Sequence, residues 1–292
     1  MVSIFEKLKP DVIVCPFCKE LLIKKEKFLF CLKCNKEYPI INNVPYFLIE
    51  SNKSEYSLSS RNFEFRSRIR NSRIFKILKY IFGADFVPYD PLKKFHSIFL
   101  GTKDDRFIVL NLGSGSKNYG RRVVNLDVEA FPNIDIVADG CCLPFAADTF
   151  DAVIAEAVIE HVKYPDKFTA EIKRVLKKGG AIFIVAPFVH PFHSYPNDYQ
   201  RYSIEGLRVL FEDFKEIESG VYRGPSVAFI GIFSDYLAGI FSFLCHPIHL
   251  LMKSIFTILI FPIKFLDIIL AKGKKSYILA HSVYYIGKKV NE

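Results

Sequence analysis

The chain has 292 residues, half of them hydrophobic, which is long enough for one full domain and a smaller module. Its formal net charge of +9 favours an anionic partner such as nucleic acid, an acidic membrane surface or a phosphorylated substrate. The sequence does not start with an apolar signal stretch, and four of its seven cysteines have metal-ligand spacing. We therefore expect a cytoplasmic protein and not a secreted, disulfide-stapled one.

Four cysteines near the N-terminus have the spacing of a metal site. They form two Cys-x-x-Cys pairs that are twelve residues apart, and they are Cys15, Cys18, Cys31 and Cys34. Two such pairs supply four thiolates to a closed tetrahedral Zn²⁺ site, in which the metal is structural and no position is open for catalysis. A module of about forty residues buries little core, so the metal would supply much of its stability. Two disulfides, or a site that has lost its metal, are the alternatives.

The segment after this module is polar and then strongly basic. Residues 50–60 are rich in serine, which is typical of a linker. Residues 61–79 carry seven basic residues against one acidic residue, with apolar residues between them. This pattern predicts a basic, loosely amphipathic helix. Such a helix could lie on anionic lipid, along a nucleic-acid phosphate backbone, or on the core as an ordinary solvated helix.

Short β-branched runs alternate with turns and one amphipathic helix between Phe107 and Pro187. The runs that predict strands are 107–112, 123–126, 134–138, 152–155 and 181–186. The first strand is followed at once by Gly113-Ser114-Gly115, the next two end at Asp127 and Asp139, and the helix is predicted over 166–178. Such alternation is typical of a parallel sheet that binds its ligand at the carboxyl ends of the strands.

Six motifs in this stretch carry a family resemblance. They are Asp139-Gly140, Leu143-Pro144-Phe145, Asp148-Thr149-Phe150-Asp151, Glu160-His161-Val162, Arg174-Val175-Leu176-Lys177 and Gly179-Gly180. In this order they resemble the class I S-adenosylmethionine-dependent methyltransferases of type 11. The Cys₄ module with the residues that follow it, Glu37 to Pro45, resembles the zinc ribbons of small proteins that activate tRNA methyltransferases.

The resemblance implies a binding site for S-adenosylmethionine. Its residues would be Asn111, Gly113, Ser114, Gly115, Asp127, Asp139, Gly140 and Glu156. The glycine loop would hold the methionine end of the cofactor, Asp127 the ribose hydroxyls and Asp139 the adenine amino group, while Glu160-His161 would open onto the substrate side. The family usually has an acidic residue where this chain has Asn111, which keeps an acceptor but loses the charge that pairs with the methionine ammonium.

The loop after the fifth strand, residues 188–202, concentrates polar groups where they would lie over the cofactor cleft. His193 is our first candidate for a general base, with Asp198 as its orienting partner or a metal ligand, and His190 is the second candidate. Histidine titrates near neutrality, which suits proton removal from a hydroxyl or a phenol. The alternative is a lid that is held by local hydrogen bonds and aromatic packing.

Residues 226–271 carry only four formal charges and stand between the strands predicted at 214–221 and 278–286. Prolines at 247 and 262 interrupt the apolar runs before either reaches the roughly twenty residues of a membrane span. Helices embedded in the membrane interface, or a re-entrant hairpin, fit this pattern. A helical cap or a dimer interface is the alternative. The insertion follows a strand that should run parallel to its neighbours, so it would lie beside the substrate mouth.

These patterns together predict an α/β protein with a Rossmann-like, seven-stranded methyltransferase sheet. The predicted parts are a zinc ribbon over 1–50, a linker and basic helix over 51–100, a methyltransferase domain over 101–225 plus 276–292, and a hydrophobic helical insertion over 226–275. We expect methylation, preferably at oxygen, of a lipid-linked or membrane-proximal acceptor by a protein peripheral to the inner face of the membrane. An RNA methyltransferase that binds RNA through its ribbon and basic helix is the first alternative. A non-catalytic scaffold that binds S-adenosylmethionine is the second.

Overall fold

The computed structural model describes residues 3–48, 86–87, 89–97, 107–117, 119–193, 197–242 and 245–290. The predicted linker over 50–60 and the predicted basic helix over 61–79 lie outside the described residues. Of the predicted middle segment 51–100, only 86–87 and 89–97 are described, and they contain helix α5 (Pro91–Phe95).

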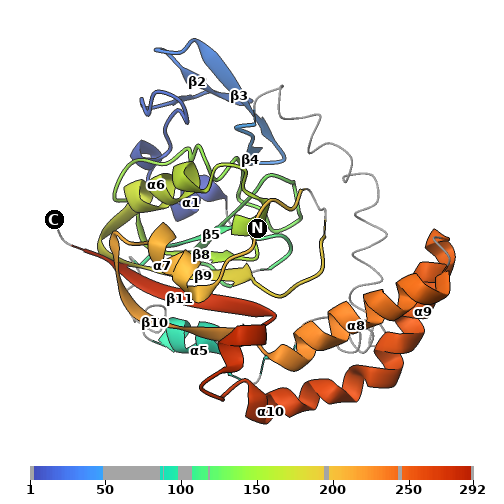
Figure 1. Ribbon diagram of the computed structural model, residues 1–292. Helices are drawn as coiled ribbons and strands as arrows, with labels where there is room; N and C mark the ends of the chain where they lie inside the picture. The colour runs from blue at the N-terminus through green and yellow to red at the C-terminus, as the bar shows by residue number, and fades with distance from the viewer. Residues whose placement is uncertain are drawn as a thin grey trace.

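The centre of the protein is a seven-stranded sheet (Figure 1). Its strands are β5 (Val109–Leu112), β6 (Val123–Asp127), β7 (Ile136–Val137), β8 (Phe150–Glu156), β9 (Leu176–Pro187), β10 (Phe214–Arg223) and β11 (Ser282–Lys289). They are arranged in the order β10-β11-β9-β8-β5-β6-β7, and β11 is antiparallel to both of its neighbours while the other pairs are parallel. The predicted Rossmann-like α/β sheet is therefore confirmed, and its parallel strands end along one edge.

Helices cover both faces of the sheet (Figure 1). Helices α6 (Pro165–Val175) and α7 (Ile204–Leu210) bury Phe168, Ile172 and Leu207 in the core of one face. On the other face, Phe95 of α5 packs against Phe183 of β9 with ring centroids 5.5 Å apart. A sheet that is covered on both faces buries every residue of its central strands, which explains the near-continuous apolar runs of β5 and β6.

Two element boundaries differ from the predictions. The helix predicted over 166–178 ends at Val175, and β9 begins at the next residue, so the Gly179-Gly180 pair lies inside a strand. Gly179 adopts a φ of +72°, a conformation that glycine tolerates best. The last strand starts at Ser282, because residues 276–279 form a short 3₁₀ turn, η6 (Ser276–Leu279), with no buried side chains.

The N-terminal module packs directly on the β7 edge of the sheet. It contains α1 (Ile4–Lys7), η1 (Pro10–Val12) and the antiparallel strands β1 (Ile23–Lys24), β2 (Phe28–Cys31), β3 (Lys36–Ile41) and β4 (Val44–Pro45). Phe47 donates its N–H to the Val137 carbonyl at 2.8 Å, and Ile13 pairs with Phe145. Lys7 forms a 2.7 Å ion pair with Asp135 of the sheet domain. Because the two parts share one hydrophobic core, the module is fixed to the sheet.

Between β10 and β11 the chain forms a helical hairpin. Its elements are α8 (Pro225–Ser242), α9 (His246–Ile260), η5 (Phe261–Leu266), α10 (Asp267–Leu270) and η6. Figure 1 shows α8 and α9 projecting away from the sheet. The carboxylate of Asp235 on α8 lies 2.8 Å from the Lys253 ammonium and 3.4 Å from Nε2 of His249, both on α9, and so joins the two helices. Because β10 is parallel to β9, α8 leaves from the edge at which β5, β6 and β8 end.

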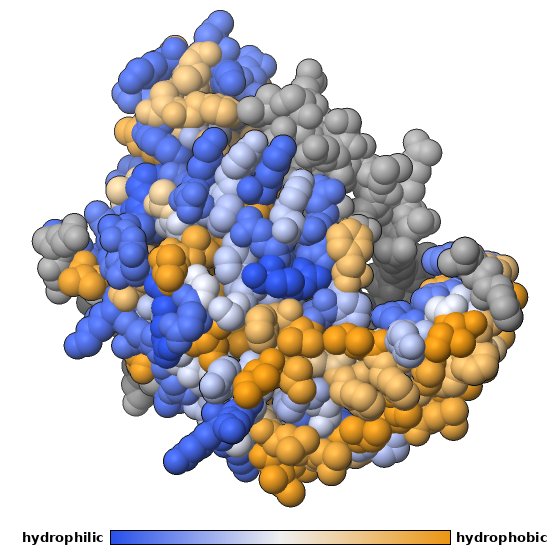
Figure 2. All heavy atoms as spheres, in the orientation of Figure 1, coloured by the Kyte–Doolittle hydropathy of each residue, from blue (hydrophilic) through white to orange (hydrophobic). Residues whose placement is uncertain are grey.

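The polarity of this hairpin is inverted relative to a water-soluble helix pair. Its buried polar side chains include Ser226, Ser234, Ser242, Thr257, Lys264 and Asp267. Its exposed side chains are mostly large and apolar, and Figure 2 shows them as a continuous hydrophobic surface over the hairpin. We call this the apolar hairpin surface; it includes Phe229, Ile232, Tyr236, Ile240, Phe241, Ile248, Leu250, Leu251, Ile255, Ile258, Leu259, Phe265, Leu266, Ile268, Ile269 and Leu270. Monomeric proteins in water rarely expose a patch of this kind.

Asp267 joins α10 to the base of α8, where the hairpin leaves the sheet. It is fully buried and accepts hydrogen bonds from the backbone N–H groups of Ser226, at 2.9 Å, and Val227, at 3.2 Å, in the first turn of α8. We expect Asp267→Ala to lower the free energy of unfolding by about 1–3 kcal/mol, because two buried donors lose their partner. Urea unfolding checks the value, and hydrogen exchange should show faster exchange in α8. Asp213→Ala, at an exposed pair with Lys173, is the matched control and should change stability by less than about 0.5 kcal/mol. Equal stability of the two variants would contradict the anchoring role.

Candidate functional site

A cavity of about 470 Å³ opens at the carboxyl ends of β5, β6 and β8. The residues that line it include Gly113, Gly115, Asp127, Val128, Asp139, Gly140, Cys141, Val158, His161, Tyr164, Phe168 and Tyr199. Its size lies within the range of roughly 300–1,000 Å³ that is usual for small-molecule sites. The cavity therefore lies at the place in the fold where parallel sheets of this type bind nucleotides.

The glycine loop after β5 fits a ligand at close range. Gly113 has a φ of +58°, and a Cβ atom there would meet Cγ2 of Val158 at 2.3 Å. Gly115 has a φ of +52° with open space above it, so that a ligand can approach its backbone. Between them, the buried Ser114 hydroxyl has no hydrogen-bond partner among the described residues. An unpaired buried hydroxyl beside an open cavity is the arrangement that a polar ligand would complete.

Two of the predicted aspartates stand at the mouth of the cavity. Asp127 ends β6 and accepts the N–H groups of Gly115, at 2.8 Å, and Glu129, at 3.1 Å. Burial raises the pKa of the Asp127 carboxyl, and these two N–H groups offset part of that increase. Asp139 accepts the N–H of Cys141 at 2.8 Å. Each carboxylate keeps lone pairs for a ligand, since one oxygen can accept two hydrogen bonds.

Three other predicted cofactor residues do not line the cavity. Besides Ser114, described above, they are Asn111 and Glu156. Asn111 donates from its amide to Asn125 on β6 at 3.0 Å, in a buried pair. Glu156 accepts a hydrogen bond from Tyr222 at 3.0 Å and pairs with Lys117 at 2.9 Å. These partners satisfy Glu156 and orient it away from the residues that form the cavity wall.

The loop after β9 is held by a buried ion pair. Asp198 binds the Arg201 guanidinium through both of its oxygens, and this pairing holds the pKa of the Asp198 carboxyl below its usual range. Asp198 also accepts the backbone N–H of His193 at 2.9 Å. The Oδ2 atom of Asp198 lies 3.6 Å from Nδ1 of the His193 ring, which is too long for a hydrogen bond. Asp198 therefore orients the His193 backbone, not its imidazole.

Four histidines pack together behind the cavity. The ring of His193 lies 4.9 Å from that of His161 and 4.7 Å from that of His190, and His190 lies 4.6 Å from His281. Of these, only His161 lines the cavity. Burial, together with the neighbouring His190 and His161, lowers the pKa of His193 to about 4. At neutral pH the His193 ring is uncharged and carries a free lone pair.

Glu160, which the family resemblance places with His161 on the substrate side, is a functional candidate whose burial the sequence does not predict. It is 1% exposed, and neither carboxylate oxygen has a hydrogen-bond partner among the described residues. Burial raises its pKa to about 7. Its Oε1 lies 3.8 Å from Nε2 of His161, whose Nδ1 contacts the Asn197 carbonyl. The sequence places Glu160 next to His161 but does not reveal its burial, which depends on the loop of residues 188–202, where Tyr199 donates its N–H to the Glu160 carbonyl.

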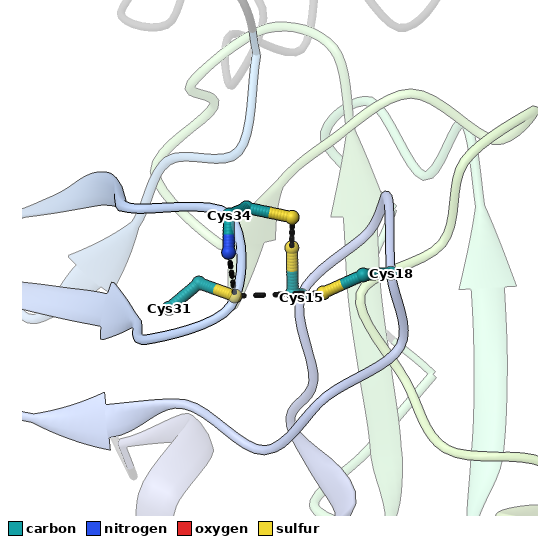
Figure 3. A group of neighbouring side chains, drawn as sticks. All are labelled: Cys15, Cys18, Cys31 and Cys34. Atoms are coloured by element: carbon teal, nitrogen blue, oxygen red, sulfur yellow. Dashed lines mark hydrogen bonds between the residues drawn. The ribbon is translucent and has the colours of Figure 1, made fainter.

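The four N-terminal cysteines converge on one point (Figure 3). Their sulfur atoms lie within 4.8 Å of one another; Cys15 is 3.9 Å from Cys34, and Cys18 is 3.5 Å from Cys31. A tetrahedral site with metal–sulfur bonds near 2.3 Å has sulfur–sulfur edges of about 3.8 Å. The Tyr38 hydroxyl lies 3.2 Å from the Cys15 sulfur. The four thiols are free of disulfides and fit a closed metal site.

Comparison with known proteins agrees with this geometry. Residues 112–184, from β5 into β9, match the methyltransferase domain family. A demethylmenaquinone methyltransferase of Renibacterium salmoninarum is 32% identical over 112 residues, which cover 38% of this chain and 47% of that protein. An uncharacterized protein of Methanocaldococcus jannaschii is 45% identical over 49 residues, which cover 17% of this chain and 24% of that protein. The chain thus spans less than half the length of the curated relatives that it matches.

The chain is also similar to solved structures, at low sequence identity. A phosphoethanolamine N-methyltransferase of Haemonchus contortus in complex with S-adenosyl-L-methionine has a TM-score of 0.44 and 16% identity, over 78% of this chain and 60% of that one. A SAM-dependent methyltransferase of Archaeoglobus fulgidus has a TM-score of 0.42 and 17% identity, over 78% and 99%. The segment from β5 to β9 is a class I methyltransferase domain, and the cofactor of such domains is S-adenosylmethionine.

Proposed function

We propose that this methyltransferase domain transfers a methyl group from S-adenosylmethionine to an oxygen atom of an acceptor at a membrane surface. The inverted polarity of the hairpin supports the membrane part of this proposal most directly. Water would favour the opposite distribution, with Lys264 and Asp267 outside and Ile269 inside. A lipid phase reverses that preference, and the lysines at 272, 274 and 275, at the end of α10, would meet lipid phosphates.

The position of the hairpin connects the membrane to the reaction. Helix α8 leaves the sheet at the edge where the cavity opens, so an acceptor that is partly embedded in lipid would reach the cavity without leaving the membrane. α8 is the one helix among the described residues that is long and apolar enough to cross a bilayer. Ser226, Ala228 and Ser234 of α8 are buried against the protein. We therefore place the hairpin in the membrane interface, on the inner face of the membrane, and not across it.

The residues of the cavity would bind and orient the cofactor. S-adenosylmethionine supplies an activated methyl group on a sulfonium ion. The glycine loop would hold its methionine end, Asp127 its ribose hydroxyls and Asp139 its adenine amino group. Most of the acceleration would come from holding the acceptor oxygen in line with the methyl group and excluding water. The histidine cluster with Glu160 stands behind the acceptor side, where the proton of a hydroxyl would leave. Because burial lowers the pKa of both His193 and His190, our first and second candidate bases would each be weak at neutral pH, and the proposal rests on positioning of the acceptor.

We also propose that the Cys₄ cluster holds one structural Zn²⁺, as the resemblance to zinc ribbons predicts. The four sulfur atoms fill a tetrahedral coordination sphere, so no position stays open for substrate. Hydrogen bonds that run from this module to the wall of the cavity would couple the metal to the cofactor site.

Product analysis tests the proposed acceptor. The protein is incubated with methyl-labelled S-adenosylmethionine and either membrane lipid extract or total RNA. We expect label in the organic phase and none in RNA. Label in RNA would favour the alternative of an RNA methyltransferase, for which the net charge of +9 is the supporting observation. No label in either, from protein that binds S-adenosylhomocysteine, would contradict both acceptor classes.

The membrane contact has a separate test. Leu259 and Ile269 are 68% and 75% exposed on the apolar hairpin surface. We expect the double variant Leu259→Asn, Ile269→Asn to bind phosphatidylglycerol-containing vesicles at least about tenfold more weakly, since each side chain contributes roughly 1.5–3 kcal/mol when fully buried in an apolar phase. Vesicle flotation measures the binding. Val209→Asn, which removes a 72% exposed side chain on α7, is the control. A wild type that does not float, or that dimerises through the hairpin, would overturn the proposal.

A further inference from the structure

We propose that Glu160, His161 and His193 bind a divalent first-row transition-metal cation on the acceptor side of the cofactor cavity. One ligand atom of each residue lies within 4.8 Å of the others. Two imidazole nitrogens and one carboxylate oxygen are the donor set that proteins use for zinc and for non-haem iron(II), with open positions for substrate. This site is separate from the cysteine cluster, and its role in catalysis depends on the proposed methyl transfer.

The burial of Glu160 is the first observation. The carboxylate is 1% exposed, and both of its oxygens lack a hydrogen-bond partner among the described residues. A buried carboxylate without partners is costly, and proteins retain one when it is paired, coordinated to a metal or held for chemistry. Since Oε1 lies 3.8 Å from Nε2 of His161, a cation bonded to both at about 2.1 Å requires a shift of only a few tenths of an ångström.

The second observation is the orientation of the two histidines. Nδ1 of His161 contacts the Asn197 carbonyl, so that it must donate and leave Nε2 free to accept a metal. A carbonyl that holds the far nitrogen of a ligand histidine is the usual support of a metal site. His193 is fixed through its backbone by Asp198. The Nδ1 atom of the His193 ring is buried and has no hydrogen-bond partner among the described residues.

The charges around the site permit a cation. Asp198 and Arg201 form an ion pair and cancel. Arg223 lies over the Tyr222 ring, 5.0 Å from its centroid, and its positive charge lies near the Glu160 carboxylate without a hydrogen bond between them. The ring of His190 lies 4.7 Å from that of His193, and His281 packs against His190 at 4.6 Å. A divalent ion at this site would therefore lie near the carboxylates of Glu160 and Asp198 and the guanidinium groups of Arg201 and Arg223.

His161 gives this site access to the reaction, because it lines the cavity. A cation there would bind the oxygen of an acceptor hydroxyl and lower its pKa, as metals do for bound water. The hydroxyl proton would pass to solvent, and the oxygen electron pair would attack the methyl carbon. The carbon–sulfur bond would break, leaving a methyl ether and the neutral thioether S-adenosylhomocysteine.

Cobalt binding tests the site without relying on activity. Protein that already holds zinc at its cysteines is titrated with Co²⁺, followed by visible absorption and by metal analysis after dialysis. We expect the wild type to take up one Co²⁺ without the thiolate absorption of a cysteine site. Glu160→Gln and His193→Asn should each weaken this binding by at least about tenfold, while zinc content and S-adenosylhomocysteine affinity stay unchanged. His246→Asn, at an exposed histidine that begins α9, should bind like the wild type.

The outcomes separate the two proposals. Wild-type protein that binds S-adenosylhomocysteine but no Co²⁺ overturns the metal site and leaves the methyltransferase intact. Co²⁺ binding that Glu160→Gln does not weaken also overturns it, and would favour Glu160 as a proton donor or acceptor. Co²⁺ binding without S-adenosylhomocysteine binding would support the site and contradict the proposed function.

Discussion

Replacing Asp127 by alanine is expected to weaken the binding of S-adenosylhomocysteine by about a hundredfold or more. The carboxylate would accept both ribose hydroxyls, and a hydrogen bond to a charged group contributes roughly 1.5–3 kcal/mol. Two such bonds correspond to at least about 3 kcal/mol, and a tenfold change in affinity corresponds to 1.4 kcal/mol. The same carboxylate also fixes the glycine loop through the Gly115 N–H at 2.8 Å, so its loss would loosen the methionine end of the site as well.

Isothermal titration with S-adenosylmethionine and S-adenosylhomocysteine measures this effect on zinc-loaded protein. Asp139→Ala removes one hydrogen bond to adenine and should cost about tenfold. Asp213→Ala is the surface control, since Asp213 pairs only with Lys173 at an exposed position. An Asp127→Ala variant that is folded and binds as tightly as the control would exclude Asp127 as the ribose ligand. Folded wild type that binds neither compound would contradict the cofactor assignment itself.

The strands and the glycine loop could be predicted because their signals are local. Continuous β-branched runs identify strands that are buried on both faces, and an aspartate at the end of a run must lie at the carboxyl edge of a parallel sheet. Asp127, Asp139 and Gly115 line the cavity for that reason. Glu156 was predicted by the same logic, but its side chain turns toward Lys117 and Tyr222. The side of the sheet to which the last residue of a strand points depends on the turn that follows it, which sequence spacing does not fix.

The hairpin and Glu160 depend on contacts between distant segments. The sequence shows that Lys264 and Asp267 share a helical face, but only the fold reveals that this face is turned inward, against Gly224 and the start of α8. The resemblance places Glu160 on the substrate side, but its burial appears only in the fold, where Tyr199 donates its N–H to the Glu160 carbonyl and the loop lies over it. Long-range burial of this kind carries no signature within a short window of sequence.

Loss of the metal from the cysteine cluster is expected to unfold the N-terminal module and to weaken cofactor binding. The knuckle at Cys15–Lys19 packs on the turn after Asp139, which lines the cavity. Lys19 donates to the Leu143 carbonyl at 3.1 Å and pairs with Glu171 at 2.8 Å, and Cys142 donates to the Pro16 carbonyl at 2.9 Å. These contacts adjoin Asp139 and Cys141, which line the cavity. Since structural zinc supplies much of the folding energy of such small modules, the cavity wall would lose its support.

Cys31→Ser tests this coupling, because Cys31 is fully buried at the centre of the cluster. We expect zinc to fall from one per chain to nearly none, fast hydrogen exchange over residues 13–47, and an S-adenosylhomocysteine affinity about tenfold weaker, as the loss of one or two hydrogen bonds would give. Cys245→Ser, at an exposed cysteine before α9, is the matched control and should keep both the metal and the affinity. Zinc retained by Cys31→Ser would exclude the proposed cluster as its site. Complete zinc loss with unchanged cofactor affinity would show that the module and the cavity are energetically independent, despite the hydrogen bonds that join them.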